Sequence, residues 1–177
     1  MKSFARILTA AQERGLACLV IGGHAVNAHG YSRPTYDLDF LVERTRLAEW
    51  RTMLADLGYR EFHDGETFLQ FEPPTDDDWK VDLMHVTDDT FQKLWGERRE
   101  ETLRLGKAMV PCLNHLLALK LHALKHTRGI RGVKDMDDVL HLLETNRVDV
   151  TQPELRALFL KFGTEELYER IRDHRAR

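Results

Sequence analysis

Short apolar runs, each closed by a turn, predict strands in the first two thirds of the chain. Residues 16–21 (LACLVI) form a continuous apolar run that two glycines follow at once, which is typical of a buried strand. Residues 36–42 (YDLDFLV) predict a second strand, in which polar and apolar positions alternate at the start. Further strands are expected at residues 59–62, 67–71 and 79–86, and a hairpin at residues 101–110 with its turn at Gly106–Lys107.

Amphipathic spacing predicts helices between these strands and after them. In the first part of the chain the helices are expected at residues 2–14, 24–29 and 46–57. After Pro111 the pattern is helical, with segments at residues 113–125, 134–144, 154–162 and 164–175. We therefore expect an α/β (α+β) fold, in which a small mixed β-sheet flanked by helices precedes a helical C-terminal part. Residues 1–111 would form the core, and residues 112–177 would pack on it to give a single compact unit.

The composition is that of a globular protein. Of the 177 residues, 42% are hydrophobic and 31% are charged, which excludes the disordered and membrane-spanning classes. The N-terminus lacks the apolar core and cleavage site of a signal peptide. Cys18 and Cys112 stand far apart among aliphatic residues, so we expect buried free thiols in a cytoplasmic protein.

The net charge of −3 excludes a global basic field of the kind that marks many nucleic-acid binders. One local exception is the segment from Lys120 to Lys134, which contains basic residues and no acid. Its loop, residues 126–134, would bind a triphosphate or an RNA backbone, or it would simply be solvated surface.

Two carboxylates share one face of the second predicted strand. Because side chains alternate along a strand, Asp37 and Asp39 point one way while Leu38 and Phe40 point the other. At about 5 Å and an effective dielectric near 20, two such charges repel by roughly 3 kcal/mol. Oxygen ligands of this kind favour Mg²⁺ or Mn²⁺, although a solvated polar face would also explain them.

A third acid and a glycine pair complete the candidate chemistry. Asp82 alternates with apolar residues in WKVDLMHV and would stand near an incoming nucleophile, unless it is an edge-strand surface residue. Gly22 and Gly23 would let the backbone approach phosphates, or they would only allow tight packing. The Arg33 guanidinium suits phosphate geometry and precedes the Asp37 strand.

The segment VIGGHAVNAHGYSRPTYDLDFLV resembles the signature of the DNA-polymerase-β-like nucleotidyltransferase superfamily. That signature is a strand, a Gly-Gly or Gly-Ser pair, a short helix and an acidic DxD strand, with a third Asp on a later strand. Within the superfamily the chain resembles the branch of AbiEii-type toxins and their uncharacterised bacterial relatives. PCLNHLLALKLHALKHTRGIRGVKDMDDVLHLL is similar to that branch's helical region, which has an embedded lysine and a later acidic helix.

The resemblance implies a nucleotidyltransferase fold with ATP or another nucleoside triphosphate as donor. It also implies Mg²⁺ (or Mn²⁺) on Asp37 and Asp39, with Asp82 as the third acid of the metal site. Lys120 lies in an apolar helix, where it would extend to water or meet an anion. The resemblance implies that this anion is a nucleotide phosphate and that Asp135 orients Lys120 or the nucleotide.

Three functions remain open at this point. The leading hypothesis is transfer of a nucleoside monophosphate to RNA, at a tRNA end, or to a protein, in a toxin–antitoxin setting with a cognate antitoxin and no membrane partner. The second is a small-molecule acceptor, because aminoglycoside and lincosamide nucleotidyltransferases share a similar Gly-Gly…Arg…DxD segment. The third is a catalytically silent nucleotide-binding module, because Gly23 stands where many active members carry Ser.

Overall fold

The chain divides into two compact units. The computed structural model describes residues 2–126 and 130–175. The first unit comprises Met1–Ala28 and Arg33–Cys112, and the second comprises His29–Ser32 and Leu113–Arg177. The short segment His29–Ser32 therefore interrupts the first unit in sequence and belongs to the second.

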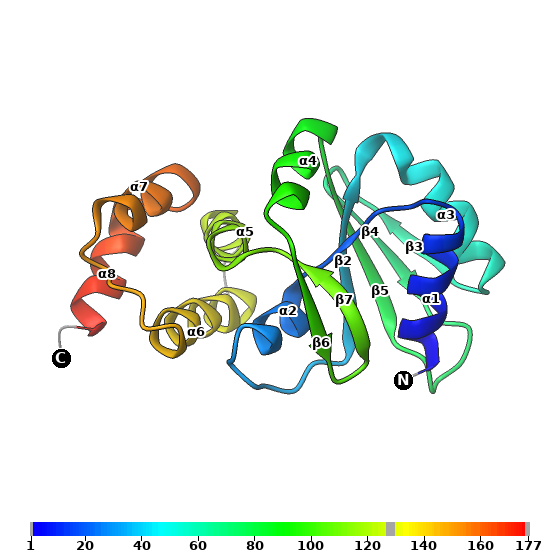
Figure 1. Ribbon diagram of the computed structural model, residues 1–177, viewed down its shortest axis with the longest axis horizontal. Helices are drawn as coiled ribbons and strands as arrows, with labels where there is room; N and C mark the ends of the chain where they lie inside the picture. The colour runs from blue at the N-terminus through cyan, green and yellow to red at the C-terminus, as the bar shows by residue number, and fades with distance from the viewer. Residues whose placement is uncertain (1, 127–129, 176–177) are drawn as a thin grey trace. The chain divides into compact units, whose positions relative to one another are not determined.

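A five-stranded mixed sheet forms the centre of the first unit, with the strand order β1-β2-β5-β4-β3 (Figure 1). Neighbouring strands are antiparallel except for β2 and β5, which run parallel. This arrangement confirms the predicted α/β class with a mixed sheet. The strands are β1 (Leu19–Val20), β2 (Asp37–Glu43), β3 (Arg60–Asp64), β4 (Phe68–Glu72) and β5 (Lys80–Val86).

Helices α1 (Lys2–Glu13) and α3 (Leu47–Asp56) lie side by side and cover one face of this sheet (Figure 1). The ring of Phe40 on β2 stacks on Phe4 of α1 and on Trp50 of α3, with centroid distances of 6.3 and 6.2 Å. All three rings are buried, as is Leu38, which shares the face of Phe40. The alternation of β2 therefore directs Asp37 and Asp39 to the other face of the sheet.

The remaining elements of the first unit correct two expectations. Helix α4 (Asp88–Gly96) was not predicted, although Thr87 caps it by accepting a hydrogen bond from the Thr90 amide. A Thr followed by two acids is a helix-start signal. The prediction did not use this signal, because Thr87 directly follows the predicted strand at residues 79–86. The hairpin turns at residues 104–105 and not at Gly106–Lys107, because Leu103 pairs with Gly106. The other elements are α2 (Gly22–Ala28), η1 (Arg44–Arg46), β6 (Arg99–Leu103) and β7 (Gly106–Val110).

The second unit is helical, as predicted for the C-terminal part. Its buried side chains are mainly Leu, Val, Phe and Tyr, and the Tyr168 hydroxyl donates a hydrogen bond to the Val150 carbonyl at 3.0 Å. Helix α6 starts at Ile130, four residues before the expected start at residue 134. The described helices are α5 (Leu113–His126), α6 (Ile130–Thr145), α7 (Pro153–Phe162) and α8 (Glu165–Arg175).

A buried ion triad joins α5 to α6 within this unit. The Lys120 ammonium contacts Asp135 Oδ1 and Asp138 Oδ2, both at 2.7 Å. The side chains of Lys120, Asp135 and Asp138 are 11%, 9% and 0% exposed. A buried carboxylate without a partner is costly, so the lysine compensates both acids in the helical core.

Each cysteine occupies a different environment. Cys18 is buried, and burial raises the pKa of its thiol to about 12. Cys112 is only half-buried, against the expectation of two buried thiols, and its thiol donates to Glu97 Oε2 at 3.5 Å. No helix among the described residues is both long and apolar enough to cross a membrane.

We expect Lys120→Met to lower the free energy of unfolding by about 3–5 kcal/mol, because it leaves two buried carboxylates without their cation. Urea denaturation followed by circular dichroism measures this change. Lys125→Met, at an exposed lysine of the same helix, should change it little. The triple variant Lys120→Met/Asp135→Asn/Asp138→Asn should regain much of the loss, and a Lys120→Met protein as stable as the wild type would contradict the assignment.

We expect a thiol reagent such as DTNB at about pH 8 to label Cys112 and to leave Cys18 unmodified in the folded protein. At that pH a thiol with a pKa of about 12 holds almost no reactive thiolate, and Cys18 is also buried. A Cys112→Ser variant should then show no fast labelling until denaturant is added. Fast labelling of that variant without denaturant would mean that Cys18 is accessible.

Candidate functional site

Three polar side chains form one row across the face of the sheet opposite α1 and α3. Asp39 on β2 pairs in register with Asp82 on β5, and Asp82 pairs with Gln70 on β4. Register partners on neighbouring strands point to the same face, with the strands about 5 Å apart. All three residues are partly buried. The structure thus brings together two of the three predicted acids and adds a residue that was not predicted.

Asp37 lies one pleat further along β2, in register with Lys80 of β5. Its Oδ1 accepts a hydrogen bond from the Thr35 hydroxyl at 2.7 Å. Lys80 itself pairs with Glu72 at 2.8 Å. Asp37 therefore sits beside the row of Asp39 and Asp82, with its orientation fixed by Thr35.

Gln70 holds the third acid. Its side-chain nitrogen Nε2 lies 3.1 Å from Oδ1 and 3.1 Å from Oδ2 of Asp82. In the sequence, FLQFE shows only a polar residue between two apolar ones. The strand register is needed to place that residue beside Asp82, so sequence reasoning missed it.

The acids do not converge on one point. The oxygens of Asp37, Asp39 and Asp82, all described residues, do not lie within 4.8 Å of one another as a set. Thr35 orients Asp37, and Gln70 holds Asp82 from the β4 side. An ion shared by all three would therefore require side-chain rotation, which two torsions in each Asp allow.

The glycine pair lies in the first turn of α2, which begins two residues earlier than predicted. Gly22 has φ +58°, and a Cβ there would lie 1.8 Å from Asp39 Oδ2. A Cβ on Gly23 would lie 2.6 Å from Thr35 Oγ1 and 3.0 Å from Arg33 Nη1. Both glycines are thus explained by close packing of α2 against the acid strand and the residues just before it.

Arg33 is attached to α2 through Asn27, a residue that sequence reasoning did not select. The Asn27 amide donates to the Arg33 carbonyl at 3.0 Å, and the Arg33 amide donates to Asn27 Oδ1 at 2.9 Å. The Arg33 guanidinium also donates to the Pro34 carbonyl at 3.2 Å. These bonds hold the arginine beside the first turn of α2, where a Cβ on Gly23 would meet it.

His24 is buried next to the site between aromatic rings. Its ring stacks on Trp79 at a centroid distance of 5.6 Å, and Phe4 lies at 6.3 Å. Burial lowers the pKa of His24, while the charge of Asp37 acts in the opposite direction. Among the described residues its Nε2 atom has no hydrogen-bond partner. The His24 ring therefore packs between Trp79 and Phe4, where burial favours its uncharged form.

Lys120 and Asp135 lie in the second unit, in the ion triad with Asp138. The three acids Asp135, Asp137 and Asp138 were expected to open a helix, where its dipole would stabilise them. That expectation is wrong, because α6 starts at Ile130 and the acids follow its first turn. Asp135 and Asp138 are stabilised by Lys120, and a nucleotide contact by Lys120 stays a prediction. Of the predicted basic loop, residues 127–129 lie outside the described residues.

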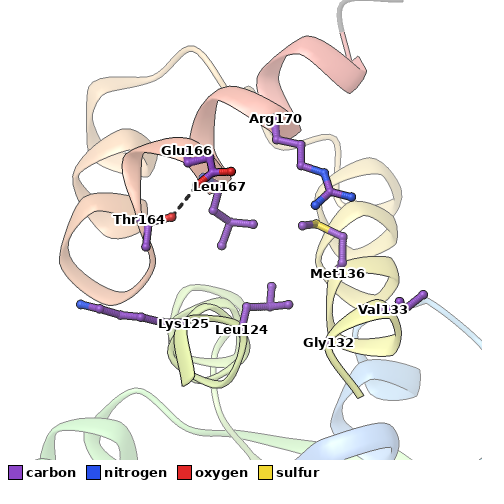
Figure 2. Close-up of a pocket in the computed structure, with 9 residues that line it drawn as sticks. All are labelled: Leu124, Lys125, Gly132, Val133, Met136, Thr164, Glu166, Leu167 and Arg170. Atoms are coloured by element: carbon purple, nitrogen blue, oxygen red, sulfur yellow. Dashed lines mark hydrogen bonds between the residues drawn. The ribbon is translucent and has the colours of Figure 1, made fainter. Parts of the chain in front are cut away.

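A cavity of about 390 Å³ lies among α5, α6 and α8 of the second unit (Figure 2). Leu124, Met136 and Leu167 form apolar parts of its wall. Thr164 caps α8 by accepting a hydrogen bond from the Leu167 amide at 3.2 Å. Charged groups also line it, namely Lys125, Glu166 and Arg170. Of its described lining residues, one alone is a carboxylate and none belongs to the predicted site.

Three solved structures share the fold. ANT(2'')-Ia, solved in complex with adenylyl-2''-tobramycin, is 16% identical with a TM-score of 0.63, and the match covers 98% of this chain and 97% of that chain. The lincosamide antibiotic adenylyltransferase LnuA, lincomycin-bound, is 16% identical with a TM-score of 0.57, over 80% of this chain and 96% of that chain. An antigenic nucleotidyltransferase-like protein from Paracoccidioides brasiliensis is 12% identical with a TM-score of 0.54, over 89% and 85%.

These likenesses confirm the nucleotidyltransferase fold expected from the sequence. None of the curated proteins matches the chain. Residues 1–172 match the model of a family described as uncharacterised nucleotidyltransferase. This match confirms the predicted superfamily, whereas the AbiEii-type branch stays a prediction. The chain therefore belongs to this family of nucleotidyltransferases.

Proposed function

We propose that the chain transfers a nucleoside monophosphate from a nucleoside triphosphate to an acceptor, with Asp37, Asp39 and Asp82 as its metal-binding and catalytic acids. One observation carries this proposal: Asp39 and Asp82 are register partners on parallel strands, on the face opposite the apolar core. Like charges directly opposite each other destabilise a sheet. A site that places them there gains from a bound cation.

The donor set fits a divalent metal. Carboxylate oxygens are the ligands that Mg²⁺ and Mn²⁺ prefer, and these acids stand on one face of the sheet within side-chain reach of one another. The absence of a side chain at Gly22 leaves the space that the Asp39 carboxylate occupies. When bound, the metal would supply positive charge for the α-phosphate and its leaving group.

The residues around the acids would bind and orient the triphosphate. Gly22 and Gly23 would offer backbone N–H groups to phosphate oxygens, and the Arg33 guanidinium would neutralise part of the charge. The acceptor hydroxyl or amine would attack the α-phosphorus, its proton would pass to the Asp82 carboxylate, and pyrophosphate would leave. For the second unit by itself, we propose separately that Lys120, oriented by Asp135, binds a phosphate oxygen.

Two acceptor classes fit this site. One is RNA, such as a tRNA end, or a protein, in a toxin–antitoxin setting with a cognate antitoxin. The other is a small molecule, and one observation favours it. ANT(2'')-Ia and LnuA match this chain over 97% and 96% of their own length.

A label-transfer assay tests the proposal and identifies the acceptor. Purified protein is incubated with nucleoside triphosphates labelled at the α-phosphate, Mg²⁺ or Mn²⁺, and separately with RNA, a protein extract, or a panel of small hydroxyl and amine compounds. Label in one of these fractions establishes the transfer and its acceptor class. Nucleotide binding without transfer to any fraction would indicate the catalytically silent module.

We expect Asp39→Asn to reduce transfer by more than about 100-fold, because losing even an indirect partner of a metal costs 10–100-fold. Its Tm should equal or exceed that of the wild type, since the substitution removes one of two adjacent like charges. The control is Asp76→Asn, which removes an exposed acid from the turn before β5 and should keep full activity. An active Asp39→Asn enzyme, or one that fails to fold, would count against the proposal.

We expect Gly22→Ala to abolish transfer and to lower stability by more than the left-handed backbone alone would cost, about 1–2 kcal/mol. The added methyl group would overlap Asp39 Oδ2, 1.8 Å away, and displace the carboxylate. Gly15→Ala is a matched control, because Gly15 has φ +62° with nothing within 4 Å of the added atom. Transfer assays and urea denaturation of both variants separate strain from overlap, and equal effects would reject the overlap.

A further inference from the structure

We propose that Gln70 is a positioning residue for this site: its side-chain amide fixes the Asp82 carboxylate and so sets how Asp82 meets the metal and the acceptor. The inference rests on the proposed function of the acids. It goes beyond that function by assigning a role to a residue on a strand that carries none of them.

The contact is specific to the amide group. Gln70 Nε2 lies 3.1 Å from each oxygen of Asp82, so the two oxygens share one N–H of the amide in a bifurcated hydrogen bond. If the Gln70 side-chain amide were flipped by 180°, its carbonyl oxygen would face the Asp82 carboxylate. Both groups are hydrogen-bond acceptors, so no hydrogen bond could form between them. The bond is also supported by the backbone, because Gln70 and Asp82 are register partners in β4 and β5.

The order of the strands explains why Asp82 needs this partner. Asp39 on β2 and Gln70 on β4 flank Asp82 on its two sides. Repulsion from Asp39 acts on Asp82 from one side, and the amide holds Asp82 from the other. Each carboxylate oxygen has two acceptor positions, so the hydrogen bond from Gln70 does not by itself block a metal or a proton.

The fold itself depends on the neighbours of Gln70 more than on Gln70. Leu69 and Phe71 are each 1% exposed and place β4 against the apolar core, whereas Gln70 faces the opposite side and is partly buried. Removing the amide should therefore disturb Asp82 and leave the sheet in place. This separation makes the role testable.

The test compares Gln70→Met with the wild type. Met keeps the length of the side chain and removes both N–H donors. Mn²⁺ binding is measured by electron paramagnetic resonance with a non-hydrolysable nucleoside triphosphate analogue present, and transfer kinetics and Tm are measured in parallel. We expect Mn²⁺ affinity and kcat to fall about 10–100-fold, the range for loss of a ligand's hydrogen-bond partner, with the KM for the nucleotide and the Tm close to wild type.

Two further variants complete the design. Gln92→Met removes another glutamine amide that donates to a carboxylate, Glu43 Oε1 at 2.6 Å, away from the acids, and it should change neither Mn²⁺ affinity nor kcat. Gln70→Glu keeps the shape and puts a further negative charge beside Asp82. Without metal it should have a lower Tm than Gln70→Met, and added Mn²⁺ should raise that Tm.

The outcomes separate this inference from the proposed function. A wild-type protein that binds Mn²⁺ and transfers label, with Gln70→Met equal to it in both, overturns the role of Gln70 alone. A wild-type protein that neither binds Mn²⁺ nor transfers label overturns the proposed function, and the role of Gln70 with it. A Gln70→Met protein with a lower Tm as well as a lower activity would show that the amide stabilises the fold. That result would also reject the positioning role.

Discussion

The placement of Asp39 and Asp82 side by side on two parallel strands is the constraint around which the first unit is built. Two carboxylates about 5 Å apart repel by roughly 3 kcal/mol at an effective dielectric near 20. No gain in packing requires an acid at either position, because the opposite face of the strands supplies the apolar core through Leu38 and Phe40. Repulsion between the two acids by itself opposes folding, and local conflicts of this kind are expected at functional sites.

The neighbours of these acids are arranged around that constraint. Gln70 donates to both oxygens of Asp82, and Thr35 donates to Asp37. Gly22 lacks a side chain where the Asp39 carboxylate lies. These contacts orient the three carboxylates on one face of the sheet.

The second unit treats buried charge in the opposite way. Lys120 contacts Asp135 and Asp138 directly, so the charges are compensated inside the protein. A lysine bound in this manner contributes to stability because it compensates the charge of two buried acids. The same contacts make it less available to a phosphate. Asp37 and Asp82 in the first unit therefore accept hydrogen bonds from neutral groups, whereas Asp135 and Asp138 in the second contact a lysine.

Much of this could be predicted from local pattern. The alternation in YDLDFLV placed Asp37 and Asp39 on one face of a strand, the apolar runs gave the mixed sheet, and the continuous amphipathic spacing after Pro111 gave the helices. These features depend on neighbours within a few residues, so a single sequence contains them. Helix α4 was not predicted for a local reason, because its capping residue Thr87 directly follows a strand.

The sequence by itself thus determined the class of fold and the placement of Asp37 and Asp39 on one face of a strand. Only the tertiary structure decided that Gln70 stands beside Asp82, that Asn27 attaches Arg33 to α2, and that Lys120 is bound by two acids of another helix. Asp135 and Asp138 are 15 and 18 positions from Lys120 in the sequence, and Gln70 is 12 positions from Asp82. Strand register and helix packing bring such residues together, and neither leaves a periodic signal in the chain.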